Sequence, residues 1–171
     1  MRSLKRLKIG GIILSILGLI NSACGQKNFD KKLDLLLSYS VPIITAEDLS
    51  LKENKEDVYF LDIRSEKEFA ISHLPNAKLM AYDNFDAAQV SGIPKNAEII
   101  VYCSVGYRSE KAGEKLMNAG YTNVRNIYGG IFEWKNQGNM VVGKKDQPTD
   151  SVHTYNKNWS QWLKNGIKVY E

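Results

Sequence analysis

Cysteine and histidine are scarce in this chain, and their spacing argues against a zinc site. The 171 residues include two cysteines and two histidines. Together with the carboxylates, these residues do not occur at the spacing of a zinc site. We therefore expect no metal ion, and no motif indicates another cofactor.

The chain also lacks an apolar run long enough for a typical transmembrane helix. The run at residues 9–20 is short of the about 20 residues that such a helix needs. A basic segment, residues 1–8, precedes it, which is the layout of an export signal. The small residues directly before Cys24 resemble the lipobox of bacterial lipoproteins, although Asn21 stands where that motif usually has leucine.

This resemblance implies that residues 1–23 are a signal peptide and that Cys24 carries the lipid. Residues 24–40 then form the lipidated N-terminus and a polar spacer. We expect an exported protein, lipid-anchored to a bacterial membrane, with its folded part in the periplasm or at the cell surface. An uncleaved anchor and a freely secreted form are the alternatives.

Acidic residues are absent from the first 23 positions, which hold four of the 23 basic residues. The remainder of the chain has 19 basic and 19 acidic residues. A body this close to neutral lacks the basic footprint of a nucleic-acid-binding protein, so we expect no nucleic-acid partner.

Beyond the spacer, short apolar runs alternate with amphipathic segments. The pattern predicts strands at 58–61, 78–81, 97–102 and 124–128, and helices at 34–37, from Thr45, from Ser65, at 109–118 and around Trp134. Asp48 and Glu68, each three residues after one of these helix starts, are placed to complete capping boxes. Strands that alternate with helices form a mostly parallel sheet. Because the strands are continuously apolar, we expect an α/β fold whose central sheet has helices on both faces.

Cys103 is the candidate reactive residue. With Cys24 lipidated, it is the sole thiol of the mature chain, whereas exported proteins usually place their cysteines in disulfides. A lone thiol there indicates a chemical role, with a small buried apolar residue as the alternative interpretation. Cys103 directly follows the strand at 97–102, and open α/β sheets bind ligands beyond the carboxyl ends of their strands.

The loop that follows Cys103 is suited to holding an anion. Gly106 permits backbone angles that let successive N–H groups turn inward as an anion-binding nest, and the next helix adds its positive end. We expect the thiol in this cradle to be ionised without a neighbouring base. Arg108 adds a fixed positive charge that is able to grip an oxyanion with forked hydrogen bonds.

Three segments resemble, in order, the signatures of the single-domain rhodanese-like sulfurtransferase family. They are residues 62–64 with 68–77, residues 101–109, and residues 126–130 with Trp134. The resemblance implies a rhodanese-like three-layer domain at 41–140, followed by a C-terminal extension at 141–171. Ser72 and Asn76 depart from it, because the family commonly has glycine at both positions.

The resemblance implies sulfur transfer in two half-reactions. Cys103 attacks the outer sulfur of thiosulfate or a related donor and keeps it as a persulfide, which a thiol or cyanide then removes. The loop that would hold the persulfide consists of Ser104, Val105, Gly106, Tyr107 and Arg108. The implied partners are a small sulfur donor and a thiol acceptor, and we expect a monomer.

Two other functions remain open. One is a rhodanese-like module that only binds a partner or carries a persulfide without turnover. A cysteine-dependent phosphatase or arsenate reductase is disfavoured by loop length, since such phosphatases place arginine six residues after the cysteine and Arg108 is five after Cys103. The smaller ring suits a sulfur atom better than a phosphoryl group.

The other candidate residues have structural interpretations. Asp62 and Arg64 are supporting residues, expected to organise the fold through an ion pair that Glu68 is a candidate to join. His73 is expected to be a hydrogen-bonded structural histidine, and His153 to be solvated.

The C-terminal extension carries a small apolar cluster. Trp159, Trp162 and Leu163 are spaced to share one helix face. We expect that face to pack on the domain, with a partner-binding surface as the alternative.

Overall fold

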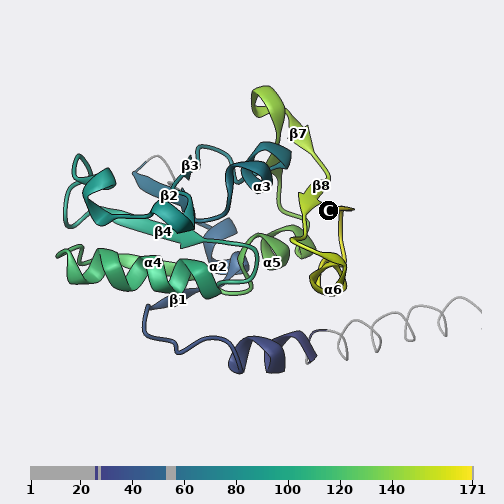
Figure 1. Ribbon diagram of the computed structural model, residues 1–171, viewed down its shortest axis with the longest axis horizontal. Coiled ribbons are helices and arrows are strands. Elements are labelled where there is room, and N and C mark those ends of the chain that lie inside the picture. Colours follow the sequence, from purple (N-terminus) through teal and green to yellow (C-terminus); the bar gives the residue numbers. More distant parts are fainter. Residues whose placement is uncertain (1–25, 27, 53–56, 171) are drawn as a thin grey trace, which may run out of the picture. The chain divides into compact units, whose positions relative to one another are not determined.

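The computed structural model describes residues 26, 28–52 and 57–170 (Figure 1). The chain divides into two compact units, residues 1–35 and 36–171. Among the described residues of the first unit, 28–34 are helical, and a turn follows at 35–36, so the helix predicted at 34–37 is wrong. Cys24 and the predicted signal peptide lie outside the described residues.

A five-stranded parallel sheet forms the centre of the second unit, in the order β1-β5-β4-β2-β3. Its strands are β1 (Ile43–Ile44), β2 (Val58–Asp62), β3 (Lys78–Leu79), β4 (Glu98–Tyr102) and β5 (Val124–Ile127). In register, Leu61 pairs with Val101, and Val101 pairs with Asn126. The carboxyl ends of the three central strands therefore meet at one edge. The predicted parallel sheet is confirmed.

Helices cover both faces of this sheet. They are α2 (Ala46–Ser50), α3 (Glu66–Ile71), α4 (Tyr107–Asn118) and α5 (Gly130–Asn136), with the 3₁₀ turns η1 (Tyr82–Asn84) and η2 (Ala87–Val90). Ile99 and Val101 of β4 share one core cluster with Leu116 of α4. Ile100 and Tyr102 alternate to the opposite face and are also fully buried. Each buried aliphatic side chain stabilises the fold by about 1.5–3 kcal/mol.

The local signals for helix starts are largely correct. Ser65 caps α3, and Glu68 returns the bond in a capping box, as predicted. Thr45 caps α2 through the N–H of Asp48, 3.0 Å away. Helix α4 begins at Tyr107, two residues before the predicted start, because Gly106 in a left-handed conformation (φ 111°) already acts as its N-cap.

The two departures from the family's glycine pattern do not disturb the turn before β3. Ser72 is extended (φ −167°), a conformation open to any residue. Asn76 is left-handed (φ 62°), and asparagine is among the residues that tolerate this region best.

The C-terminal extension folds against the domain. It contains β6 (Val141–Val142), η3 (Lys144–Asp146), β7 (Pro148–Thr149), β8 (Ser151–His153), α6 (Lys157–Ser160) and β9 (Ile167–Val169). Strands β6 and β7 pair antiparallel, β8 and β9 pair parallel, and β8 lies against α3 (Figure 1). Leu163 is fully buried, so the expected packing is present. The prediction that Trp159, Trp162 and Leu163 share one helix face is wrong, because α6 ends at Ser160.

In the part of the chain that the structure describes, none of the helices combines the length and apolar character needed to cross a membrane.

Candidate functional site

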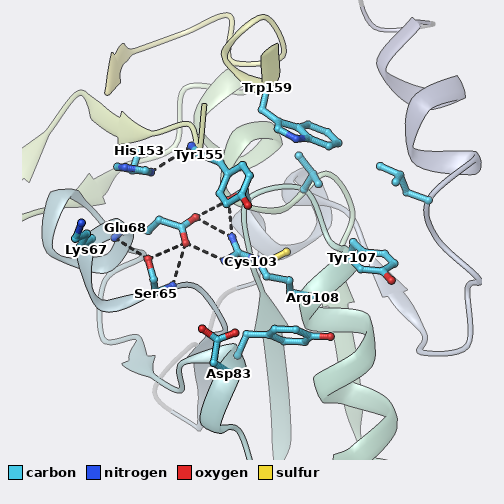
Figure 2. Close-up of a pocket in the computed structure, with 14 residues that line it drawn as sticks. Ser65, Lys67, Glu68, Asp83, Cys103, Tyr107, Arg108, His153, Tyr155 and Trp159 are labelled. Atoms are coloured by element: carbon cyan, nitrogen blue, oxygen red, sulfur yellow. Dashed lines mark hydrogen bonds and ion pairs between the residues drawn. The ribbon is translucent and has the colours of Figure 1, made fainter. Parts of the chain in front are cut away.

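Cys103 lies directly after β4, at the carboxyl edge of the sheet, and lines a cavity of about 540 Å³ (Figure 2). The residue is almost completely buried. Its Sγ atom accepts a hydrogen bond from the backbone N–H of Gly106, at 3.2 Å. The predicted loop thus curls back on the sulfur.

The first turn of α5 orients the backbone of this loop. The carbonyl oxygens of Cys103 and Ser104 accept hydrogen bonds from the N–H groups of Ile131 (2.9 Å) and Phe132 (3.2 Å). A Cβ atom on Gly130, which has a φ of 56°, would lie 2.3 Å from the Cys103 carbonyl oxygen. The absence of a side chain on Gly130 therefore lets α5 approach the loop and hold these two carbonyls through its first N–H groups.

Asn126 of β5 fixes the other side of the loop. Its side-chain Nδ2 donates to the carbonyl of Gly106 at 2.9 Å, and its Oδ1 accepts from the hydroxyl of Ser109 at 2.8 Å. All three groups are buried. The sequence analysis placed Asn126 in the family's closing segment but gave it no role, although an asparagine within a buried strand is a signal that its amide has a partner.

Glu68 of α3 anchors the loop to the rest of the domain. Its carboxylate accepts two hydrogen bonds from the Arg108 guanidinium, at 2.7 and 2.9 Å, and one from the Ser104 hydroxyl, at 2.9 Å. The N–H of Ser65 donates to the same group at 3.0 Å. Glu68 is thus a partner of Arg108 and not a member of the Asp62–Arg64 pair, which corrects the sequence interpretation.

The pairing changes how Arg108 bears on the site. Both of its terminal nitrogens bind Glu68, so the guanidinium holds the loop in place, and it also lines the cavity beside Cys103. Burial lowers the pKa of Arg108, but the hydrogen bond to Glu68 and the charge of nearby Cys103 outweigh burial and raise it above its ordinary value. Burial alone would raise the pKa of Glu68, but the hydrogen bonds and charge of Arg108 lower it from 4.5 to about 2.

These values predict an acid-sensitive contribution to stability. Because the pKa of Glu68 is lower in the folded chain than its ordinary 4.5, the carboxylate stabilises the fold fully above that pH and progressively less as the pH falls towards about 2. The shift corresponds to about 3 kcal/mol. We expect Glu68→Gln to lower the free energy of unfolding at pH 7 by a similar amount, and the gap to wild type to shrink to less than about half by pH 3.

Urea unfolding at pH 7 and pH 3 measures this gap. Glu66→Gln is the matched control, since Glu66 lies on the same helix and is exposed. An equal gap at both pH values would contradict the assigned charge coupling.

The predicted ion pair of Asp62 and Arg64 is present and completely buried. Nε and Nη2 of Arg64 donate to the Asp62 carboxylate at 2.9 and 2.7 Å, and Nη2 also donates to the Ser72 carbonyl at 2.5 Å. The pair joins the end of β2 to the end of α3 and does not line the cavity. Its position is that of a supporting element.

The two histidines differ from each other. His73 is largely buried, stacks on Phe69 with 3.8 Å between ring centroids and bonds the Phe69 carbonyl through Nδ1 at 3.0 Å, as expected of a structural histidine. The prediction that His153 is solvated is wrong. It lies in β8, is 8% exposed and lines the cavity.

Other cavity residues come from the loop and from the C-terminal extension. Val105 and the half-exposed Tyr107 line it from the loop. Tyr155 and Trp159 line it from the extension and lie above Cys103 in Figure 2. The sequence analysis gave Tyr155 no role and expected Trp159 only to pack on the domain, because no pattern in the sequence shows which way the extension folds.

No set of three or more histidine, cysteine, aspartate and glutamate side chains within the described ranges is placed to hold a metal ion. The chemistry that the described groups support is nucleophilic. A buried cysteine sulfur lines the cavity, accepts an N–H bond at the start of a helix and has the Arg108 guanidinium nearby.

Comparison with known proteins places these features in a family. The family profile for the rhodanese-like domain matches residues 45–137. A sulfurtransferase of Allochromatium vinosum is 37% identical over 100 residues, which cover 58% of this chain and 92% of that protein. A tRNA uridine(34) hydroxylase of Hamiltonella defensa is 32% identical over 120 residues, which cover 67% of this chain but only 32% of that protein.

Among solved structures, a rhodanese-like domain protein of Staphylococcus aureus is similar. It is 31% identical, with a TM-score of 0.53, and the match covers 61% of this chain and 99% of that one. Residues 141–171 lie beyond the stretch that the family profile matches.

Proposed function

This chain belongs to the family of rhodanese-like domains and is similar to sulfurtransferases, and from this premise we propose that it moves sulfane sulfur through a persulfide on Cys103. The observation that carries the proposal is the hydrogen bond from the Gly106 N–H to Sγ of Cys103, inside a loop whose carbonyls face away. The backbone N–H groups of this loop are suited to hold an anionic persulfide after the transfer.

The first half-reaction charges the cysteine. The Cys103 thiolate attacks the outer sulfur of thiosulfate or a related donor, the S–S bond of the donor breaks, and sulfite leaves with the bonding electron pair. The product is the Cys103 persulfide anion, so charge and sulfur atoms balance. Glu68 and Arg108 keep the loop in its reactive shape, and Asn126 holds Gly106 in place.

The second half-reaction discharges the cysteine. A thiolate, or cyanide as a laboratory acceptor, attacks the outer sulfur of the persulfide, and the Cys103 thiolate leaves. Each half-reaction is a displacement at sulfur, so neither needs a general base once the cysteine is ionised.

The test is a sulfur-transfer assay with the purified chain. Incubation with thiosulfate and cyanide should produce thiocyanate, and thiosulfate alone should add one sulfur atom to the intact mass. Added sulfur without thiocyanate would favour a persulfide carrier. Turnover of phosphate esters or arsenate with no added sulfur would select the phosphatase or reductase alternative.

We also propose that the protein is exported and lipid-anchored through Cys24. The proposal is supported by the basic segment, the apolar run and the small residues before that cysteine. In a bacterial host, the full chain should fractionate with membranes as a processed, lipid-carrying form. The Cys24→Ser variant should lose most of that form. A mature wild-type chain that carries no lipid by mass spectrometry would overturn the proposal.

A further inference from the structure

The C-terminal extension supplies part of the wall of the Cys103 cavity. His153, Tyr155 and Trp159 line the same cavity as Cys103, although all three lie beyond the match to the family profile (Figure 2). These side chains therefore add to the domain a part of the wall that faces the reactive cysteine.

The extension is fixed in this position by the domain. Asn136 of α5 donates to the Trp162 carbonyl at 2.9 Å and accepts from the N–H of Lys164 at 2.6 Å. Lys135, also on α5, forms an ion pair with Asp150 at 2.6 Å. Tethers on both sides of β8 and α6 hold the aromatic residues over the cavity.

Tyr155 is held in a conformation that a bulky residue rarely adopts. Its φ is 64°, a left-handed backbone that costs about 1–2 kcal/mol for a residue with a Cβ atom. The turn persists because the N–H of Tyr155 bonds Nδ1 of His153 at 3.2 Å, and the N–H of Asn156 bonds the Thr154 carbonyl at 2.7 Å. The turn brings the tyrosine ring to 5.9 Å from the guanidinium carbon of Arg108, next to the reactive loop.

The cavity is aromatic and close to electrically balanced. Its aromatic walls are Tyr82, Tyr107, Tyr155 and Trp159. Among the described residues that line it, the cations Lys67 and Arg108 match the carboxylates Glu68 and Asp83 in number. Such a surface offers a small dianion little attraction beyond the loop amides, whereas an apolar group gains from burial against the rings.

The size of the cavity agrees with an organic substrate. A volume of about 540 Å³ falls within the range of about 300–1,000 Å³ typical of sites for drug-sized molecules. Thiosulfate alone fills only a small part of it.

We propose that Tyr155 and Trp159 select a small organic sulfur donor, a persulfide whose apolar substituent packs against their rings, in preference to thiosulfate. This inference rests on the proposed function of Cys103. The Cys103 thiolate attacks the outer sulfur of R–S–SH, the donor S–S bond breaks, and R–S⁻ departs with the electron pair. The outer sulfur keeps its proton and is now bonded to Cys103, so no oxidant or reductant is needed.

Thiosulfonates test the selection with stable compounds. Benzenethiosulfonate and methanethiosulfonate donate the same outer sulfur as thiosulfate but carry an aromatic or a methyl substituent. The measured quantity is the second-order rate of sulfur addition to Cys103, followed by intact mass. We expect Trp159→Ala and Tyr155→Ala to slow loading from benzenethiosulfonate roughly five- to tenfold and to change loading from thiosulfate and methanethiosulfonate less than about twofold.

Two controls separate selection from damage to the fold. Trp159→Phe keeps an aromatic face and should retain most of the preference. Tyr170→Ala removes an exposed tyrosine of the same extension that does not line the cavity, and should load from every donor at the wild-type rate. Thermal melting of each variant reports whether it is folded.

The outcomes distinguish this inference from the function on which it rests. Equal slowing with all three donors, or no slowing in either alanine variant, would overturn the role of the extension and leave sulfur transfer intact. Failure of the wild-type chain to take up sulfur from any donor would overturn both.

Discussion

Cys103→Ser is expected to abolish sulfur transfer, lowering thiocyanate production by at least about a thousandfold. Serine places a hydroxyl where Sγ now accepts the Gly106 N–H, at 3.2 Å. A hydroxyl remains protonated at neutral pH and cannot form a persulfide, whereas a thiolate attacks sulfur directly. Because the replacement is close in size and the N–H keeps an acceptor, we expect the free energy of unfolding to change by no more than about 1 kcal/mol.

Intact mass and thiocyanate formation measure this effect together. The matched control is Cys24→Ser, which removes the other cysteine of the chain and should leave sulfur uptake by the folded domain unchanged. Persistent addition of sulfur in the Cys103 variant, or its loss in the Cys24 variant, would show that the reactive sulfur has been assigned to the wrong residue.

Gly130→Ala should lower sulfur transfer by displacing the backbone of the reactive loop, although it removes no reactive group. The new Cβ would lie 2.3 Å from the carbonyl oxygen of Cys103 and 2.7 Å from that of Ser104, so either α5 or the loop must move. Movement breaks the N–H bonds that now orient both carbonyls. We expect sulfur transfer to fall by about a hundredfold or more, and the free energy of unfolding by about 3 kcal/mol or more, at the upper end of single substitutions.

Gly138→Ala is the control that isolates the clash. Gly138 also has a positive φ, 82°, but a Cβ there would meet nothing within 4 Å. It should therefore show only the cost of a left-handed alanine, about 1–2 kcal/mol, with near-normal sulfur transfer. Similar losses of activity in the two variants would mean that contact between α5 and the loop does not shape the site.

The network around Glu68 and Asn126 explains why the reactive loop needs the whole domain. Glu68 lies on α3 and Asn126 on β5, yet both bond groups of the loop between β4 and α4. Their bonds hold the backbone that faces the sulfur, so the reactive geometry is prepared before a substrate arrives.

The sequence by itself determined the features that depend on neighbouring residues. Apolar runs bounded by turn residues predicted the central strands, the Ser65–Glu68 pair predicted a capping box, and the position of Cys103 after a strand predicted its place at the sheet edge. Such signals are local, because strand and helix periodicity and capping act over a few residues.

Only the tertiary structure decided which distant groups meet at the sulfur. Glu68 is separated from Arg108 by 40 residues, and its choice of that partner over Arg64 follows from how α3 packs beside the loop. The side chains of Tyr155 and Trp159 reach the cavity because tethers from α5 fold the extension back over it. Contacts of this kind depend on the packing of whole elements, and no spacing along the chain encodes them.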